Sequence, residues 1–173
     1  MKFSELTPAR KERLRGYVRQ HWIGDGLDFE SEIDGIKRVF GFLGIEDPKH
    51  VEYDVGGNGG YFRFEGVLRP KLFDLAGVKA YAPQDEELHG VAELLVTTLT
   101  ALKLSGEGIE VYPIRRYGRA SISTSFDRLD PVINDLCDWA HALLCSAYDY
   151  AYSDENVDAI LEDREFEEDG SII

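Results

Sequence analysis

Cys137, His141 and Cys145 are the residues whose types and spacing most directly suggest chemistry. They follow one another at intervals of four, which places two thiols and an imidazole on one side of a helix and suggests zinc. A helix rises about 1.5 Å per residue, so the two sulfurs belong to backbones about 12 Å apart. Zinc–sulfur bonds of about 2.3 Å cannot gather both thiolates, and a disulfide needs a closer approach too. We therefore predict no metal site and two reduced cysteines.

Serine, histidine and carboxylate side chains do not form a recognisable hydrolytic motif. Ser121, Ser123 and Ser125 alternate along a predicted strand, without the strand-to-helix turn of a nucleophile elbow. The four histidines are scattered. The acids that begin at Asp85 stand with His89 at a predicted helix start, where negative charge complements the helix dipole. We expect a protein that is not an enzyme and binds no cofactor.

A glycine-rich segment, residues 56–60, is the most visible local pattern. A phosphate-binding loop joins a strand to a helix and continues into a lysine motif, whereas this segment joins two alternating runs. Its Asn-Gly pair supplies the positive φ angles of tight hairpin turns, so a hairpin is favoured. The alternative is an anion- or nucleotide-binding domain or enzyme, whose candidate ligand-binding residues are Gly57, Asn58, Gly59, Gly60, Arg63, Arg115, Arg116 and Arg119.

The last three of these arginines belong to a basic turn, residues 115–119, that also contains Tyr117. Arginine and tyrosine together can contact phosphate or stack on bases. The net charge of −14 opposes long-range attraction to nucleic acid. We expect no direct nucleic-acid binding.

Acidic residues are concentrated toward the C-terminus. Residues 127–173 contain 14 acidic and two basic residues, out of 33 and 19 in the whole chain. A helix can carry carboxylates at spacings close to those of nucleic-acid phosphates, and such a surface suits a basic protein surface. The candidate partner-binding residues are Asp135, Asp138, Asp149, Asp154, Glu155, Asp158, Glu162, Asp163 and Glu165. Acidity that serves only solubility is the alternative interpretation.

Length and composition indicate a packed domain. Of the 173 residues, 43% are hydrophobic and 12% aromatic, enough for a sizeable core. No apolar run approaches the roughly 20 residues that cross a bilayer, and the N-terminal segment lacks the apolar stretch of a signal peptide. We expect a cytoplasmic protein without membrane association.

The periodicity predicts helices over residues 8–22, 28–43, 84–104 and about 130–151, and a short helix capped by Ser153. Thr7 is the expected N-cap of the first helix. Strands are predicted over 51–55, 61–68, 109–114 and 120–126. The predicted class is α+β, with about four antiparallel strands in two hairpins and helices on one face. Residues 1–173 are expected to form one domain, with an acidic helix and tail over 153–173 that either packs at its end or frays.

Three stretches carry a resemblance: GNGGYFRFEG at 57–66, YGRASIST at 117–124 and DAILEDREFEEDG at 158–170. They resemble a loose group of small bacteriophage and prophage proteins of unknown function, often labelled antitoxins of toxin–antitoxin stability systems. The turn of that group usually reads Gln-Gly-Asp-Gly, and here Gly-Asn-Gly-Gly stands in its place. The resemblance implies a phage origin, residence in the host cytosol and one α+β domain. It transfers no catalytic residue.

These observations lead to one main hypothesis. The protein is expected to be non-enzymatic and to bind and inhibit a host protein, such as a defence nuclease or toxin, through its acidic C-terminal helices. Besides the anion-binding alternative, a self-associating structural protein stays open, with Trp22, Tyr148, Tyr150 and Tyr152 as interface candidates. The target and the oligomeric state stay open as well.

Overall fold

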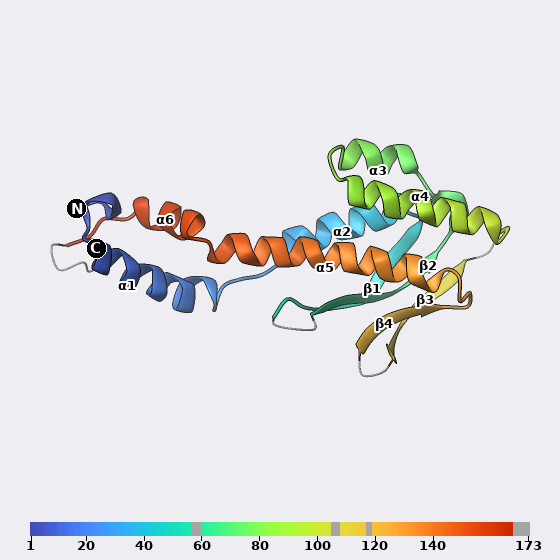
Figure 1. Ribbon diagram of the computed structural model, residues 1–173, viewed down its shortest axis with the longest axis horizontal. Coiled ribbons are helices and arrows are strands. Elements are labelled where there is room, and N and C mark those ends of the chain that lie inside the picture. Colours follow the sequence, from blue (N-terminus) through green and yellow to red (C-terminus); the bar gives the residue numbers. More distant parts are fainter. Residues whose placement is uncertain (57–59, 105–107, 117–118, 168–173) are drawn as a thin grey trace. The chain divides into compact units, whose positions relative to one another are not determined.

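The computed structural model describes residues 1–56, 60–104, 108–116 and 119–167, and only the backbone of residues 115, 116, 119 and 120. The chain divides into two compact units, drawn in Figure 1. The sheet unit is Glu30–Leu144, and the helical unit combines Met1–Phe29 with Cys145–Ile173. Compactness does not reveal whether the two units unfold together, so the single-domain expectation stays a prediction.

The sheet unit contains four strands, β1 (Ile45–Asp54), β2 (Tyr61–Leu68), β3 (Ile109–Arg116) and β4 (Arg119–Thr124). Their order is β1-β2-β3-β4 and all neighbours are antiparallel. The predicted α+β class and the two hairpins are therefore confirmed. Pairing of β2 with β3, which sets Val67 opposite Glu110, joins the hairpins into one meander.

Helices cover one face of this sheet, as predicted (Figure 1). They are α2 (Glu30–Phe42), α3 (Leu75–Tyr81), α4 (Glu86–Ala101) and α5 (Asp130–Tyr152), the last of which continues into the helical unit. Alternate side chains of β2, namely Phe62, Phe64 and Leu68, are buried, while Glu65 between them is exposed. Such alternation is what a sheet with one solvated face requires. Within the described ranges, no helix combines the length and apolarity of a membrane span.

The start of β1 and the helix α3 differ from the sequence prediction. The strand begins at Ile45 rather than Val51 and passes through Asp47-Pro48. Asp47 and His50 adopt φ angles of 45° and 47°, and the register with β2 shifts there. These bulges keep an edge strand irregular, which discourages pairing with other chains. Helix α3 was not predicted from the sequence, because seven residues are too few to show a clear apolar periodicity.

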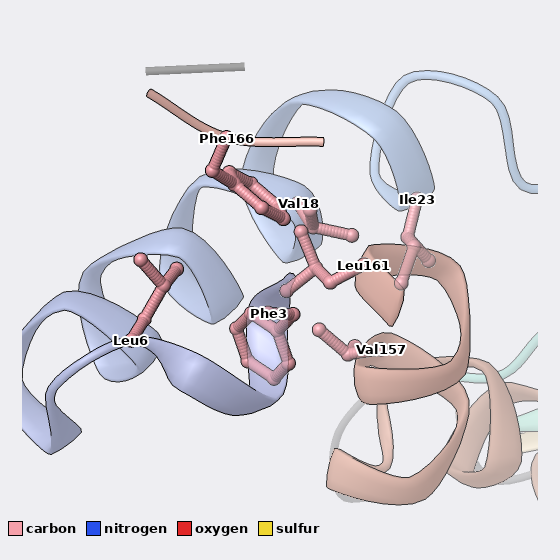
Figure 2. Packing of buried hydrophobic residues seen from close by; sticks show 7 residues of the cluster. All are labelled: Phe3, Leu6, Val18, Ile23, Val157, Leu161 and Phe166. Atoms are coloured by element: carbon pink, nitrogen blue, oxygen red, sulfur yellow. The ribbon is translucent and has the colours of Figure 1, made fainter. Parts of the chain in front are cut away.

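The helical unit comprises a 3-10 turn η1 (Phe3–Glu5), α1 (Pro8–Val18), a π-helical turn η2 (Arg19–Ile23) and α6 (Asp154–Glu162). Both ends of the chain contribute to its core, which Figure 2 shows: Phe3, Leu6, Val18, Ile23, Val157, Leu161 and Phe166. Ser153 caps α6 as predicted, since its side chain accepts a hydrogen bond from the Asn156 amide. Thr7 is the N-cap residue of α1 and Pro8 its first helical residue, as predicted, although the Thr7 side chain makes no capping hydrogen bond.

Candidate functional site

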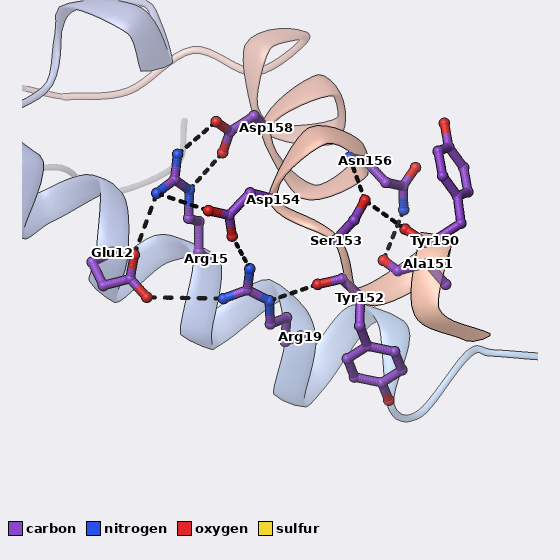
Figure 3. A network of polar contacts seen from close by, with 10 residues as sticks. All are labelled: Glu12, Arg15, Arg19, Tyr150, Ala151, Tyr152, Ser153, Asp154, Asn156 and Asp158. Atoms are coloured by element: carbon purple, nitrogen blue, oxygen red, sulfur yellow. Dashed lines mark hydrogen bonds and ion pairs between the residues drawn. The ribbon is translucent and has the colours of Figure 1, made fainter. Parts of the chain in front are cut away.

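Two of the predicted partner-binding acids, Asp154 and Asp158, face arginines of the protein itself (Figure 3). The Arg15 guanidinium donates to both carboxylate oxygens of Asp158, from Nε at 2.7 Å and from Nη2 at 2.6 Å. Its Nη1 lies 3.6 Å from Asp154, which also pairs with Arg19. Asp154 and Asp158 therefore hold α6 against α1.

The spacing of both helices explains this match. Arg15 on α1 and Arg19, which begins the π-helical turn η2 directly after it, stand four residues apart. Asp154 and Asp158 stand four apart on α6, so each pair lines one side of its helical segment. Glu12 joins from one turn earlier, 3.3 Å from Arg15. The hydrogen bond from Arg15 lowers the pKa of Asp158, and the bond to Asp158 raises the pKa of Arg15. Both groups are charged at neutral pH.

A third predicted acid, Glu162, also binds inside the helical unit. Its carboxylate accepts from the Ser4 amide at 3.0 Å and from the Ser4 hydroxyl at 2.7 Å. Arg19 adds a further tie, because its Nε donates to the Tyr152 carbonyl at the end of α5 at 3.0 Å. Asp154, Asp158 and Glu162 therefore lie together on one side of α6 and bind residues of the N-terminal segment.

The remaining predicted acids are exposed. In the helical unit, Glu155, Asp163 and Glu165, here called the outer carboxylates, have no ion-pair partner among the described residues. Glu155 stands on the solvent face of α6 and Asp163 is the exposed C-cap residue, with exposed Ala159 between them in the sequence. The further exposed acids are Asp149 in the helical unit and Asp135 and Asp138 in the sheet unit.

Asp138 and the cysteines of α5 have altered acidities. Although Asp138 is exposed as a residue, partial desolvation of its carboxyl, with the Asp135 charge as a smaller cause, raises its pKa. Burial likewise raises the pKa values of the Cys137 and Cys145 thiols above their ordinary range. Thiols with raised pKa are poor nucleophiles and poor metal ligands. Among the described residues, no three metal-binding side chains form a cluster.

Arg63, one of the four arginines proposed for anion binding, already has partners within the protein. Arg63 donates from Nε to Glu52 at 2.7 Å, and its guanidinium lies 5.1 Å from the centre of the Tyr61 ring. The Arg63 side chain is only 14% exposed. The other candidates, Gly57, Asn58 and Gly59, lie outside the described residues, as do the side chains at positions 115, 116 and 119.

Gly60 has a packing role. A Cβ at this position would lie 2.4 Å from His141 Nε2 and 2.5 Å from the Asp54 carbonyl oxygen. His141 Nε2 and that carbonyl are themselves in hydrogen-bond contact at 2.9 Å. The glycine therefore permits β2 to start close to α5, an arrangement that needs no bound ligand.

Two of the three alternating serines, Ser121 and Ser123, link the edge strand β4 to helix α5 through hydrogen bonds. The Ser121 hydroxyl donates to Asn134 at 2.9 Å, and the Ser123 hydroxyl donates to Asp130 at 3.0 Å. Both partners belong to the first turns of α5. The sequence predicted a helix that starts at about residue 130 but gave Asp130 and Asn134 no role at the sheet edge, although an Asp-Pro helix start after a strand is a usable signal for side chains that cap the strand.

Sequence reasoning also missed two surface hollows of the sheet unit. One, of about 520 Å³, lies over β1, β2 and β3, where Val67 and Tyr112 are flanked by Glu65 and Glu110. The other, of about 480 Å³, includes Phe73 and Leu99 and is flanked by Lys71 and Lys103. These residues belong to segments without clear periodicity or to different elements, so no local pattern unites them.

Comparison with known proteins adds no relative. No protein-family model matches the chain, and neither a curated protein nor a solved structure is significantly similar to it. Functional inference therefore depends on the geometry of this chain.

Proposed function

We propose that this protein is a non-catalytic binding protein whose outer carboxylates engage a basic surface on another protein. The supporting observation is that the acids on and just after α6 fall into two groups, one paired within the protein and one exposed. Asp154 and Asp158 are paired with α1, whereas Glu155, Asp163 and Glu165 stay exposed without an ion-pair partner among the described residues.

The internal pairs favour such a role because they order the helix before a partner arrives. The Arg15–Asp158 pair and the Ser4–Glu162 bonds anchor α6, which orders Glu155 on the helix and Asp163 at its C-cap, and the buried Phe166 holds the segment that contains Glu165. Binding then loses less conformational entropy than it would with a mobile acidic tail.

Charge supports the choice of a basic partner. Residues 1–29 contain six basic and four acidic residues, and residues 145–173 contain one basic and ten acidic residues. The arginines of α1 thus neutralise only part of the C-terminal acidity. A surface with this excess attracts cationic surfaces over about a Debye length, roughly 8 Å at physiological ionic strength.

A nucleic-acid-binding channel is the basic surface that carboxylates on a helix suit best. The partner class we propose is accordingly a host defence nuclease or a toxin, inhibited by occupation of that channel. This assignment accords with the phage-type resemblance of the three sequence stretches described above.

Affinity capture from bacterial lysate tests the proposal with two matched variants. One variant neutralises the outer carboxylates (Glu155→Gln, Asp163→Asn, Glu165→Gln). The other removes the same charge from exposed positions of the sheet unit (Asp34→Asn, Glu87→Gln, Asp127→Asn). We expect the wild type and the second variant to retain a basic protein that the first variant loses, with weaker retention as salt increases.

Equal capture by all three proteins, or capture that is indifferent to salt, would reject the proposal. Circular dichroism of the neutralised variant provides the folding control. Because the three substitutions leave the Arg15 and Arg19 pairs intact, the helical signal should not change.

A further inference from the structure

An apolar groove with a cationic rim lies on the sheet unit, apart from the outer carboxylates. It runs between the segment after β2 and the C-terminal end of α4 and has a volume of about 480 Å³. Hollows of this size commonly hold small ligands. The apolar lining includes Phe73, Val96, Leu99 and Leu104, and Lys71 and Lys103 supply the charge.

Some cations of the sheet unit are neutralised by carboxylates: Arg63, Arg69 and Lys79 each pair with a glutamate. Lys71 and Lys103 are both exposed, and neither has a carboxylate partner in the part of the chain that the structure describes. Two lysines without a carboxylate partner among the described residues thus line the same hollow as these apolar side chains.

Lys103 also adopts a backbone conformation that favours glycine. Its φ angle is 56°, and it occupies the position just after the end of α4. The Lys103 amide donates to the Thr100 carbonyl at 3.0 Å, and the Leu104 amide donates to the Leu99 carbonyl at 3.0 Å. This pair of bonds defines a Schellman motif, in which the left-handed residue is usually glycine because a side chain is strained there.

The same motif shapes the groove. By reversing the chain after α4, it returns Leu104 toward Leu99, the contact that usually accompanies such a cap. A lysine at the strained position therefore lowers stability at a residue that lines the groove. Strain of this kind is frequently found at binding sites.

We infer that this groove binds an apolar monocarboxylate, a ligand with a slim hydrocarbon body and one carboxylate. The apolar lining accepts the hydrocarbon, and Lys71 and Lys103 pair with the carboxylate. The lining offers few polar groups for a more polar ligand, because the Thr100 hydroxyl already donates to the Val96 carbonyl at 2.8 Å.

An NMR titration of the full-length ¹⁵N-labelled protein tests the inference with three probes of equal chain length. Sodium octanoate carries the carboxylate, octanamide is its neutral counterpart, and octylammonium chloride reverses the charge. Octanoate should shift the backbone amide resonances of Phe73, Leu99 and Lys103, and the shifts should saturate as its concentration increases. Octanamide should bind about tenfold more weakly, which corresponds to loss of one ion pair, and octylammonium should not perturb these amides.

Substitutions on the protein provide the reciprocal test. Lys71→Gln combined with Lys103→Gln should lower the affinity for octanoate to that for octanamide, whereas Lys37→Gln on α2 should leave it unchanged. Lys103→Gly gives a second readout, since it should raise the thermal midpoint while weakening octanoate binding.

Three results would overturn the inference. One is equal binding of octanoate, octanamide and octylammonium, and another is a set of shifts that never saturate and spread over the surface. The third is tighter binding of an acetylated Gly-Gly-Leu-Leu peptide with a free carboxylate, which would make a peptide terminus the occupant. Because the outer carboxylates do not line the groove, failure here would leave the proposed protein-binding function untouched.

Discussion

Asp130 and Asn134 show how single side chains finish the free edge of a sheet. The Asn134 amide exchanges two hydrogen bonds with Ile122, accepting from its N–H at 2.9 Å and donating to its carbonyl at 2.9 Å. Asp130 accepts from the Thr124 amide at 2.6 Å and from the Thr124 hydroxyl at 2.9 Å. These groups occupy the places of a further strand, so β4 has a covered edge at this point.

Asp130→Ala should therefore be strongly destabilising. Asp130 is 6% exposed, and its removal leaves the Thr124 amide and the Ser123 hydroxyl buried without their partner. Loss of bonds to a charged acceptor and the unpaired groups together should cost about 3 kcal/mol. Urea unfolding at pH 7 measures the free energy. Asp127→Ala, at an exposed neighbouring position, should change it by less than about 0.5 kcal/mol, and a similarly small effect of Asp130→Ala would contradict the capping role.

Gly60 and Gly90 form a matched pair for a second prediction at the residue scale. Gly60→Ala brings a Cβ into backbone and side-chain atoms at under 3 Å and should destabilise the protein by about 1–3 kcal/mol through overpacking. Gly90→Ala places its Cβ in open space on helix α4 and should stabilise the protein by up to about 1 kcal/mol. Thermal unfolding midpoints of the two variants, each compared with the wild type, test this prediction. An unchanged midpoint for Gly60→Ala would show that α5 does not require this glycine.

Among the elements, α1 and α6 depend on one another. Neither has a strong reason to form alone: α1 has a single buried residue, Val18, and α6 has nine residues. Isolated helices of this length are marginal in water, so tertiary packing must stabilise them. The ladder of Arg15 and Arg19 against Asp154 and Asp158 specifies which faces meet.

A double-mutant cycle on Arg15→Gln and Asp158→Asn should give a coupling free energy of about 1 kcal/mol. This lies at the upper end for a partly exposed pair, because the geometry is bidentate. Chemical unfolding at pH 7 supplies the four free energies, with Arg13→Gln as the exposed control on α1. A coupling energy indistinguishable from zero would make the pair irrelevant to stability.

The pH dependence of that coupling follows from the lowered pKa of Asp158. A carboxylate whose pKa is lower in the folded state stabilises fully above its unfolded-state value of about 3.9, and the contribution disappears as the pH falls through the folded-state value. The coupling should thus be constant from pH 5 to 7 and decrease as the pH falls below the unfolded-state value. Repeating the cycle at successively lower pH checks this, and a coupling that stays constant on acidification would contradict it.

On the scale of the molecule, the two units have separate apolar cores. The core of the helical unit contains Leu161 and Val157 from α6 and Phe3 from the other end of the chain (Figure 2). The sheet unit has its own core beneath β2 and β3, with Phe64 and Val111. Units with distinct cores can open independently.

Leu161→Ala should separate the stabilities of the two units. Leu161 is fully buried, and truncation of such a residue typically costs 2–5 kcal/mol. Hydrogen exchange should show faster exchange for α1 and α6 amides and unchanged protection for β2 and β3. If the strands lost protection equally, the units would unfold together, and the single-domain prediction from the sequence would hold instead.

The sequence determined the local elements of this protein. Alternation in YFRFEGVL predicted β2, four-residue apolar spacing predicted α2, and Ser153 before two acids predicted the start of α6, because each pattern depends only on neighbours along the chain. These elements were sufficient to assign the α+β class.

Only the tertiary structure decided which distant residues meet. Arg15 and Asp158 pair across 143 positions, a contact that no local pattern of the sequence indicates. Lys71 and Lys103 came to flank one groove because the chain returns there after α3 and α4. Charge and periodicity are local properties of a sequence, whereas the neutralisation of one charge by another depends on the path of the chain in space.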